Sequence, residues 1–281
     1  MKKLEVKKVF TPNEIAEELA ILSKNLILVG QAVNVWSEIY GDKTKEPWKG
    51  SFPFTSRDID VVGNLKQMLT GQQEFIKAGY KVTAFFPRTK EEEKINTGAL
   101  QLKSPELEVN VLKRILAVNS IAAEESALTI KLNNNLIKVL HPLLCMESKA
   151  ACLLELDQKG RNDKKHLILC IGNIKKMIQK FRDNEDLTEI VEQILKDSDT
   201  DVAVDLWKMH KIRILDAIPW EDLRKSTVED LKEIGGKEHE VEGKFKEYVQ
   251  LSLDVDKIKK NLHKRNKTPK EENGFKIDSM P

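Results

Sequence analysis

The sequence predicts an α/β (α+β) fold, in which a mixed sheet with its helices is followed by an all-helical domain. Strand-like and helix-like segments alternate over the first half, whereas helical patterns alone follow Pro142. The 281 residues accommodate one large domain or two small ones. We therefore expect an α/β domain over residues 1–141 and a helical domain over 142–264. Residues 265–281, with few apolar side chains, are expected to form a disordered tail.

The first predicted elements are a helix, a strand and a second helix. Residues 11–14 carry a helix-start pattern, with a threonine cap, a proline in the first helical position and a glutamate in the third. The apolar run 26–29 stops at Gly30 and predicts a buried strand. Apolar side chains at helical spacing between Val33 and Tyr40 predict a helix after this turn.

The remaining elements of the first half follow from alternation, glycine and asparagine. After a loop over 41–53, residues 58–62 alternate acidic and apolar side chains before Gly63, which indicates a strand. A helix is expected over 65–78. Three asparagines at 133–135 tolerate the positive φ of a tight turn and predict a hairpin. The other strands are expected near 82–86, 99–102, 107–112, 128–132 and 136–140.

The composition is that of a charged globular chain, with 40% hydrophobic and 33% charged residues. The net charge of +2 excludes neither a nucleic acid nor an acidic partner. No apolar run reaches the roughly 18 residues that span a bilayer, and the basic N-terminus lacks the apolar core of a signal peptide. We therefore expect no membrane partner. The three cysteines form no CxxC pair, so we also expect no structural zinc and a cytoplasmic location.

A separate basic stretch lies near the end of the chain. Residues 257–270 hold seven Lys and Arg residues and no acidic residue. Such a stretch either binds RNA phosphates electrostatically or forms a solvated charged tail, and the sequence leaves both open.

The turn at Gly30 is the first candidate for chemistry. Gly30 and Gln31 stand between a predicted strand and a predicted helix, where backbone N–H groups at the helix N-terminus can hold a phosphate. The alternative is that Gly30 only turns the chain, and a lone glycine motif does not distinguish the two.

Two carboxylates on one strand are the stronger candidate. Residues i and i+2 of a strand point to the same face, so Asp58 and Asp60 project together with their Cα atoms about 6.6 Å apart. Adjacent carboxylates repel unless a cation lies between them, and hard oxygen ligands suit Mg²⁺. The alternative is a solvent-facing strand. It is weakened by Ile59, Val61 and Val62, which indicate that the strand lies in a core.

A third oxygen ligand is available on the predicted strand 107–112. Glu108 and Asn110 lie on one face of this strand. Asn110 can ligate a metal through its carbonyl oxygen but cannot act as a base, whereas Glu108 can do both.

Lys149 is the candidate cation of the helical half. It stands among Ala150, Ala151, Leu153 and Leu154 in a largely apolar predicted helix. A buried lysine needs a partner, and a triphosphate is a suitable one. The alternative is that its side chain extends along the helix to the surface.

These segments together resemble the nucleotidyltransferase fold. Over roughly residues 15–170 the chain resembles the AbiEii/AbiGii-type nucleotidyltransferases, which are toxins of toxin–antitoxin and phage-defence systems. The resemblance rests on residues 30–36, on 55–60 and on the stretch around Lys149. The third acidic position of the family falls on Asn110 in this chain.

The resemblance implies an enzyme that uses Mg²⁺ or Mn²⁺ to move a nucleotide from an NTP, such as ATP, to an acceptor hydroxyl. Asp58 and Asp60 would hold the metal, with Asn110 or Glu108 as the third catalytic position. Asp163 belongs to the basic–acidic pair that follows the family's lysine, and it would anchor Lys149 or the attacking hydroxyl. The residues expected to bind the nucleotide are Gly30, Gln31, Ser56, Arg57 and Lys149.

The acceptor implied by the resemblance is RNA, tRNA or protein, and a cognate antitoxin is an implied partner. Two other functions remain open. One is a small-molecule nucleotidyltransferase of the antibiotic-modifying kind with the same core. The other is a catalytically weakened nucleotide- or partner-binding module, which the amide of Asn110 at an acidic position favours.

Overall fold

A computed structural model describes residues 9–51, 53–56, 58–180, 186–220 and 222–223. The chain divides into two compact units. The first runs to Ile190 and also takes in Asp216–Pro219, and the second takes in Val191–Leu215 and continues from Trp220. Arg57, the basic stretch 257–270 and the tail 265–281 lie outside the described residues.

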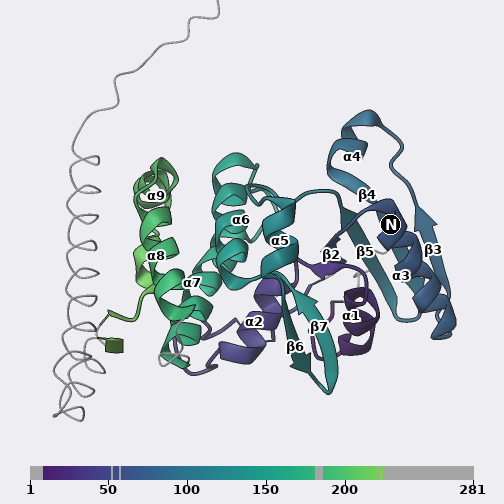
Figure 1. Ribbon diagram of the computed structural model, residues 1–281, viewed down its shortest axis with the longest axis horizontal. Helices are drawn as coiled ribbons and strands as arrows, with labels where there is room; N and C mark the ends of the chain where they lie inside the picture. Colours follow the sequence, from purple (N-terminus) through teal and green to yellow (C-terminus); the bar gives the residue numbers. More distant parts are fainter. Residues whose placement is uncertain (1–8, 52, 57, 181–185, 221, 224–281) are drawn as a thin grey trace, which may run out of the picture. The chain divides into compact units, whose positions relative to one another are not determined.

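The first unit is built on a seven-stranded mixed sheet, which confirms the predicted fold class (Figure 1). Its strands are β1 (Ile27–Leu28), β2 (Asp58–Val62), β3 (Val82–Phe85), β4 (Asn96–Lys103), β5 (Glu106–Leu112), β6 (Leu128–Leu132) and β7 (Asn135–Val139). They are ordered β3-β4-β5-β2-β1-β7-β6 across the sheet. β1 pairs in parallel with β7 and β2 with β5, while the other neighbours are antiparallel.

The helices follow the predicted division of the chain. Among the described residues after Pro142, the regular elements are helices, without a strand. No helix in the described part of the chain has both the length and the apolar character that a membrane span requires. The helices are α1 (Ala16–Ser23), α2 (Ala32–Tyr40), α3 (Leu65–Lys77), α4 (Lys90–Ile95), α5 (Ser120–Ser126), α6 (Pro142–Glu155), α7 (Asp163–Lys180), α8 (Asp186–Ser198), α9 (Asp201–Asp205), the π-helix Leu206–His210 and the 3-10 helix Ile214–Ala217.

Local sequence signals explain where several elements begin and turn. The backbone N–H of Thr11 donates to the Glu14 carboxylate at 2.8 Å, and the N–H of Glu14 donates to the Thr11 hydroxyl at 3.3 Å. This capping box precedes α1 by a non-helical turn, so the predicted helix begins later than expected, at Ala16. The hairpin between β6 and β7 is confirmed, with φ values of 46° at Asn133 and 65° at Asn134.

The sheet has one apolar and one polar face along β2 and β5. Ile59 and Val61 of β2 are fully buried, as are Val109 and Val111 of β5. Helices α1 and α3 cover this apolar face, where Met68 of α3 lies against the backbone of β4. The opposite face carries the polar side chains of Asp58 and Asp60 on β2 and of Glu106, Glu108 and Asn110 on β5.

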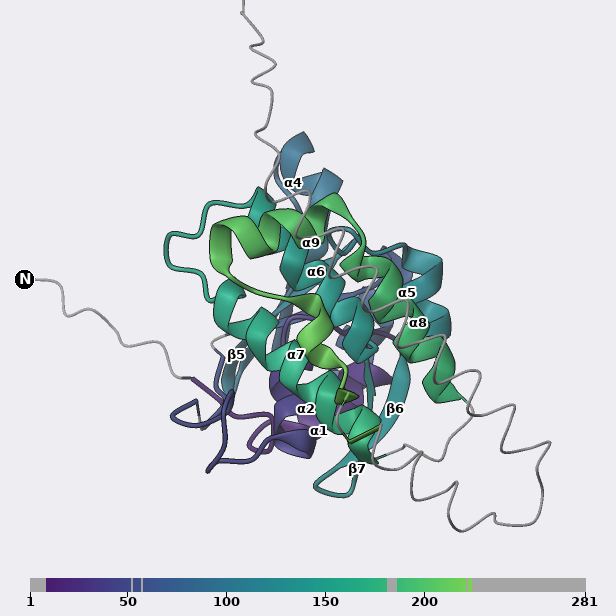
Figure 2. The ribbon, with the colours of Figure 1, turned by 90° about the vertical axis from the view of Figure 1, so that its left-hand side faces the viewer.

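Helices α6 and α7 pack against each other and against α2 (Figure 2). The buried amide of Asn173 on α7 accepts from the Trp48 indole at 3.0 Å and donates to the Ser37 hydroxyl of α2 at 3.0 Å. Trp36 of α2 donates to the carbonyl oxygen of Leu140 at 2.9 Å. The change from strands to helices at Pro142 therefore occurs inside one compact unit, whose border lies at Ile190 rather than at residue 142.

Candidate active site

The two aspartates of β2 project from the polar face of the sheet, as predicted. Burial alternates along β2, with Ile59 and Val61 inside and Asp58 and Asp60 on the other side. Asp58 is exposed and Asp60 is partly buried. Because a strand repeats every two residues, the apolar core positions of β2 determine the direction in which both carboxylates point.

The third position falls on Asn110, which lies opposite Asp60 in the β2–β5 register. Its amide nitrogen donates to Asp60 Oδ1 at 3.0 Å and to Asp58 Oδ2 at 3.4 Å, so a single NH₂ group bridges the two carboxylates. Glu108, two residues before Asn110 on β5, lies on the same face and opposite Asp58. Glu108 and Asn110 lie on a common face of β5, as predicted. Of the two, Asn110 is the residue whose amide hydrogen-bonds to both aspartates.

The electrostatics of Asp60 connect the sheet with the helical region. Burial raises the pKa of the Asp60 carboxyl, and the charge of Asp58 acts in the same direction. The Asn110 amide and the positive charges of Lys149 and Arg161 oppose this rise. The two cations come from α6 and from the segment before α7. The predicted residues of both halves of the chain therefore lie within electrostatic reach of one another.

Gly30 is needed because the Asp60 carboxylate occupies the space beside it. A Cβ atom at position 30 would overlap the Asp60 carboxylate. The N–H groups of Val29 and Gly30 both donate to the Asp60 carbonyl oxygen, at 2.9 and 3.2 Å. The Gly30 N–H is thus engaged within the protein, and a phosphate cradle formed by the N–H groups after Gly30 stays a prediction. The observed role of Gly30 is to let the turn approach Asp60 closely.

Gln31 and Ser56 support Asp58 rather than facing an open site. Gln31 is 2% exposed, and its side chain accepts from Asn34 at 2.9 Å and donates to the Asp58 carbonyl oxygen at 3.4 Å. The Ser56 hydroxyl donates a hydrogen bond to Asp58 Oδ1 at 3.4 Å. Nucleotide binding by these two side chains stays a prediction, and their contacts in the structure are with Asp58.

Lys149 and Asp163 are paired, as predicted. The Lys149 ammonium lies 3.2 Å from Asp163 Oδ1, and the Arg161 guanidinium donates to Asp163 Oδ2. Burial alone would raise the pKa of the Asp163 carboxyl, but the Arg161 hydrogen bond and the Lys149 charge outweigh it and lower that pKa. One buried carboxylate therefore holds two cations in place.

Arg161 is the functional candidate that the sequence interpretation left without a role. Its side chain is 40% exposed, compared with 16% for Lys149, so of the two cations it is the more accessible. The hydrogen bond to Asp163 raises the pKa of the Arg161 guanidinium. The available signal was the Arg–x–Asp spacing before α7, which brings the basic group and its carboxylate anchor onto one turn.

The histidine and the cysteines near Lys149 and Asp163 carry no charge at pH 7. Burial lowers the pKa of His166 to about 4, so its imidazole is neutral at pH 7, and its Nδ1 has no hydrogen-bond partner among the described residues. Cys145, Cys152 and Cys170 are buried, and burial raises the pKa of each thiol.

The donor set around Asp60 fits a hard divalent cation of the Mg²⁺ type. Mg²⁺ is commonly held by one or two carboxylates, with water and substrate phosphates completing the shell. Asp58 and Asp60 supply the carboxylates, and rotation of the Asn110 amide would present its oxygen. Within the described ranges no three His, Cys, Asp or Glu side chains form a metal-binding group. The protein alone would therefore hold such a cation by two carboxylates.

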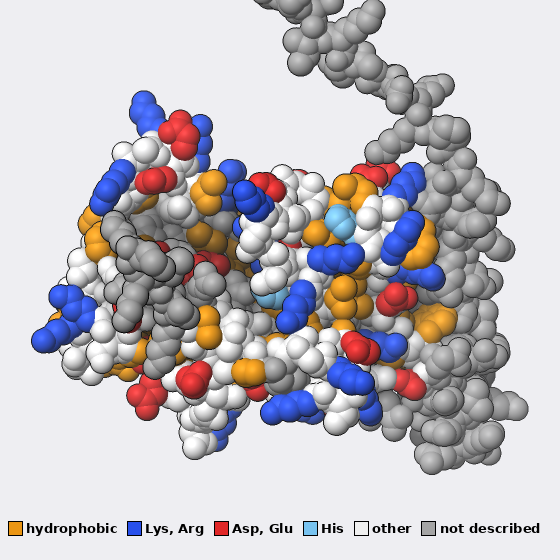
Figure 3. Space-filling model, turned by 180° about the vertical axis from the view of Figure 1, so that it is seen from behind, with side chains coloured by type: hydrophobic (Ala, Val, Ile, Leu, Met, Phe, Trp, Pro, Cys, Tyr) orange, Lys and Arg blue, Asp and Glu red, His pale blue; other side chains and the backbone are white. Residues whose placement is uncertain are grey.

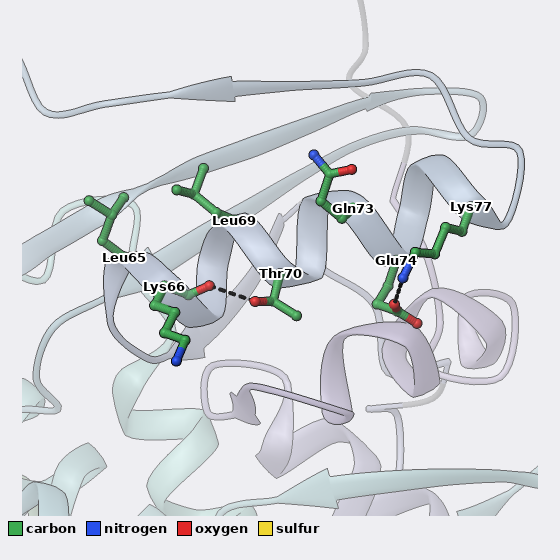
Figure 4. Close-up of a pocket in the computed structure, with 7 residues that line it drawn as sticks. All are labelled: Leu65, Lys66, Leu69, Thr70, Gln73, Glu74 and Lys77. Atoms are coloured by element: carbon green, nitrogen blue, oxygen red, sulfur yellow. Dashed lines mark hydrogen bonds and ion pairs between the residues drawn. The ribbon is translucent and has the colours of Figure 1, made fainter.

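A groove of about 700 Å³ lies elsewhere, along the outer side of α3 (Figure 4). Leu65 and Leu69 project from this helix, and Lys77 pairs with Glu74 at 2.8 Å. Its lining residues all belong to α3, which covers the apolar face of the sheet. The groove is thus on the opposite side of the sheet from Asp60 and is not part of the predicted site.

Comparison with known proteins gives no relative on which to base an assignment. No family model matches the chain, and no curated protein matches it.

Proposed function

We propose that the chain is a Mg²⁺-dependent nucleotidyltransferase that moves a nucleotide from an NTP to an acceptor hydroxyl. The proposal rests on one observation: a pair of carboxylates on β2 and two cations from the helical region belong to the same compact unit. Asp60, which is paired with Asp58, lies within electrostatic reach of the cations Lys149 and Arg161, and Asp163 holds these cations in position. A nucleoside triphosphate with a divalent cation matches this arrangement, because its phosphates need cations and its metal needs carboxylates.

The residues of the chain would contribute mainly by positioning. Lys149 and Arg161 would bind oxygens of the triphosphate and neutralise the charge that develops on the leaving pyrophosphate. Asp163 would hold both cations at a fixed distance from β2. Mg²⁺ held by Asp58 and Asp60 would lower the pKa of the attacking hydroxyl and stabilise charge on the phosphates.

Asn110 restricts how the acceptor proton can leave. An amide cannot take a proton, so this position cannot act as the general base. Glu108 is the other acidic residue on the same face of β5, one row along. An acceptor that binds over β5 would bring its hydroxyl between these two positions. RNA, tRNA or a protein side chain can supply that hydroxyl, and a toxin role with a cognate antitoxin is part of the same proposal.

The first test is transfer of label from α-³²P-labelled ATP, GTP, CTP and UTP to total RNA and protein in the presence of MgCl₂, with pyrophosphate release measured in parallel. The proposal expects Mg²⁺-dependent transfer from at least one NTP, lost in Asp58→Asn and in Asp60→Asn. Glu17→Gln is the matched control, because Glu17 is an exposed carboxylate on α1, which covers the opposite face of the sheet. Activity that survives in both aspartate variants would contradict the site.

A second candidate is an inert nucleotide- or partner-binding module. It is favoured by the Asn110 amide, which satisfies both carboxylates by hydrogen bonds without a metal. The two functions differ in one measurement. An inert module would bind an NTP in a calorimetric titration with Mg²⁺ and release no pyrophosphate, whereas the enzyme would do both.

A further inference from the structure

The polar face of the sheet continues beyond the carboxylates to the edge strand β3. In the strand register Asp60 lies opposite Asn110, Asn110 opposite Ala99, and Ala99 opposite Phe85. These four residues therefore form one row across β2, β5, β4 and β3. At about 4.8 Å between strands, Phe85 stands roughly 14 Å from Asp60 along this row.

Among the described residues, the β3–β4 part of this face is exposed and carries an aromatic ring. Phe85 is 43% exposed, although its neighbours Ala84 and Leu100 turn inward. The next row places exposed Gln101 opposite exposed Thr83. The residue opposite Phe85 on β4 is the small Ala99.

Lysines lie at the far end of the same face. Exposed Lys103 precedes the β4–β5 turn, and its backbone N–H donates to the carbonyl oxygen of Lys81 at 3.1 Å. Alternation along β3 and β4 puts both lysines on the side of Thr83 and Gln101. The acidic residues of the face lie on β2 and β5, where Glu106 stands opposite Lys103 and Glu108 opposite Gln101. The face thus changes from acidic at the reacting centre to basic at the edge.

We infer that this face, defined by Phe85, Thr83, Gln101, Lys103 and Lys81, binds a single-stranded segment of an acceptor RNA and leads its reacting end to Asp60. The inference rests on the proposed nucleotidyltransferase function. An exposed aromatic ring on an open sheet stacks a base, neutral polar side chains bond to base edges, and lysines bind phosphates.

The position of the cations assigns the face to the acceptor and not to the NTP. Lys149 and Arg161, the cations that act on Asp60, come from the helical side. Lys103 ends β4 and Lys81 directly precedes β3, so both lie beyond β5, toward the β3 edge of the sheet. Lys81 and Lys103 would therefore bind phosphates of the RNA backbone and not those of the NTP. On the side of the molecule seen in Figure 3, acidic and basic side chains are interspersed, so contact with RNA would be local.

The test is fluorescence polarisation of the full chain with a 5′-labelled 12-nucleotide single-stranded RNA of mixed sequence, without NTP or Mg²⁺. Phe85→Ala should weaken binding roughly 5- to 150-fold, the range of one lost base stack. Phe85→Trp should retain the affinity of the wild type. Phe86→Ala is the matched control, because Phe86 is 54% exposed but follows the last residue of β3, and it should change little.

Nucleotide binding, measured separately by calorimetry with Mg²⁺ and each NTP, separates the two claims. The inference expects unchanged NTP affinity in Phe85→Ala. A loss of NTP affinity without a loss of RNA affinity would overturn it, since the ring would then hold the base of the NTP. Absence of RNA binding by the wild type, or equal losses in Phe85→Ala and Phe86→Ala, would also overturn it. A failure of NTP binding in the wild type would instead contradict the proposed function.

Discussion

The two faces of strand β2 differ in what they contribute to the protein. Ile59 and Val61 point into the apolar layer under α1 and α3, and both are fully buried. Asp58 and Asp60 alternate with them and carry the proposed chemistry. Stability and function are therefore separated by single positions along one strand, so substitutions on the two faces should have opposite effects.

The largest expected difference is between Asp60→Ala and Ile59→Ala. Asp60→Ala, like Asp58→Ala, should abolish transfer. Without metal its free energy of unfolding should stay level or rise, because removing one carboxylate relieves repulsion and desolvation. Ile59→Ala should lower the free energy of unfolding by about 2–5 kcal/mol. The rate of nucleotide transfer per folded molecule should be the same in Ile59→Ala as in the wild type. Urea denaturation and the transfer assay measure the two properties, and parallel changes in both variants would contradict the separation.

A substitution at Gly30 should lower both the stability of the protein and its transfer activity. Gly30→Ala should cost about 1–3 kcal/mol of stability, because the new Cβ must displace the Asp60 carboxylate, and it should also abolish transfer. Gly71→Ala is the control, since its Cβ would meet Leu26 at an ordinary 3.6 Å within helix α3. It should stabilise the chain by about 0.5–1 kcal/mol. Equal effects of both substitutions on stability would refute the steric role of Gly30.

Two partly buried histidines should make the protein less stable as the pH is lowered, independently of the carboxylates. Burial lowers the pKa of His141 and of His166 to about 4, below the ordinary value of 6.5. Between these values the unfolded chain binds more protons than the folded chain. Unfolding free energy should drop by about 1.4 kcal/mol per pH unit for each histidine as pH falls from 6.5 to 4.

Denaturation of His141→Asn at pH 7 and pH 5 checks this slope. Asparagine replaces the helix-capping acceptor that His141 offers to the N–H of Leu143, but it does not titrate. The variant should therefore lose less stability than the wild type between the two pH values. An identical loss in both proteins would show that burial of His141 does not govern this pH dependence.

Lys149 should affect nucleotide affinity more than stability. Lys149→Ala should weaken NTP binding roughly 10- to 150-fold, and Lys149→Arg should weaken it less, because the role is charge on phosphate. Lys175→Ala, an exposed lysine on α7, is the control and should leave affinity unchanged. Calorimetric titration with Mg²⁺ and NTP gives the affinities, and equal binding by wild type and Lys149→Ala would assign the lysine a structural role.

The smallest effects are expected at the third position, where they identify the remaining carboxylate. Because Asn110 touches both aspartates, Asn110→Asp should raise Mg²⁺-dependent activity and lower stability without metal. Glu108→Gln should then change little. If Glu108 serves as the base instead, Glu108→Gln should abolish transfer and Asn110→Asp should be nearly silent. Loss of activity in both variants would contradict both versions.

The sequence was most informative where a short-range rule decides the structure. The alternation of Asp58, Ile59 and Asp60 predicts their faces, and the Asn133–Asn134 pair predicts the tight hairpin. Helices α4 and α5 were missed because each is short and has no apolar period. The caps that begin them are local hydrogen bonds, from Glu92 N–H to the Thr89 hydroxyl and from Ile121 N–H to Asn119.

The contacts that complete the site could not be predicted in the same way. Gly30 reads as a turn glycine, yet its necessity comes from Asp60, thirty residues later and on another strand. The approach of Arg161 to Asp60 depends on how α6 and α7 pack on α2 through Asn173. Such contacts are set by tertiary packing, which a single sequence does not display.

The most direct test of the central claim is calorimetric titration of Mg²⁺ with each NTP into the wild type and into the double variant Asp58→Asn, Asp60→Asn. The account predicts that the wild type binds at least one NTP, that removing Mg²⁺ with EDTA weakens this binding, and that the double variant loses the Mg²⁺ dependence while remaining folded. Equal, Mg²⁺-dependent NTP affinity in the wild type and the folded double variant would contradict the assignment of this face of β2 as the active site.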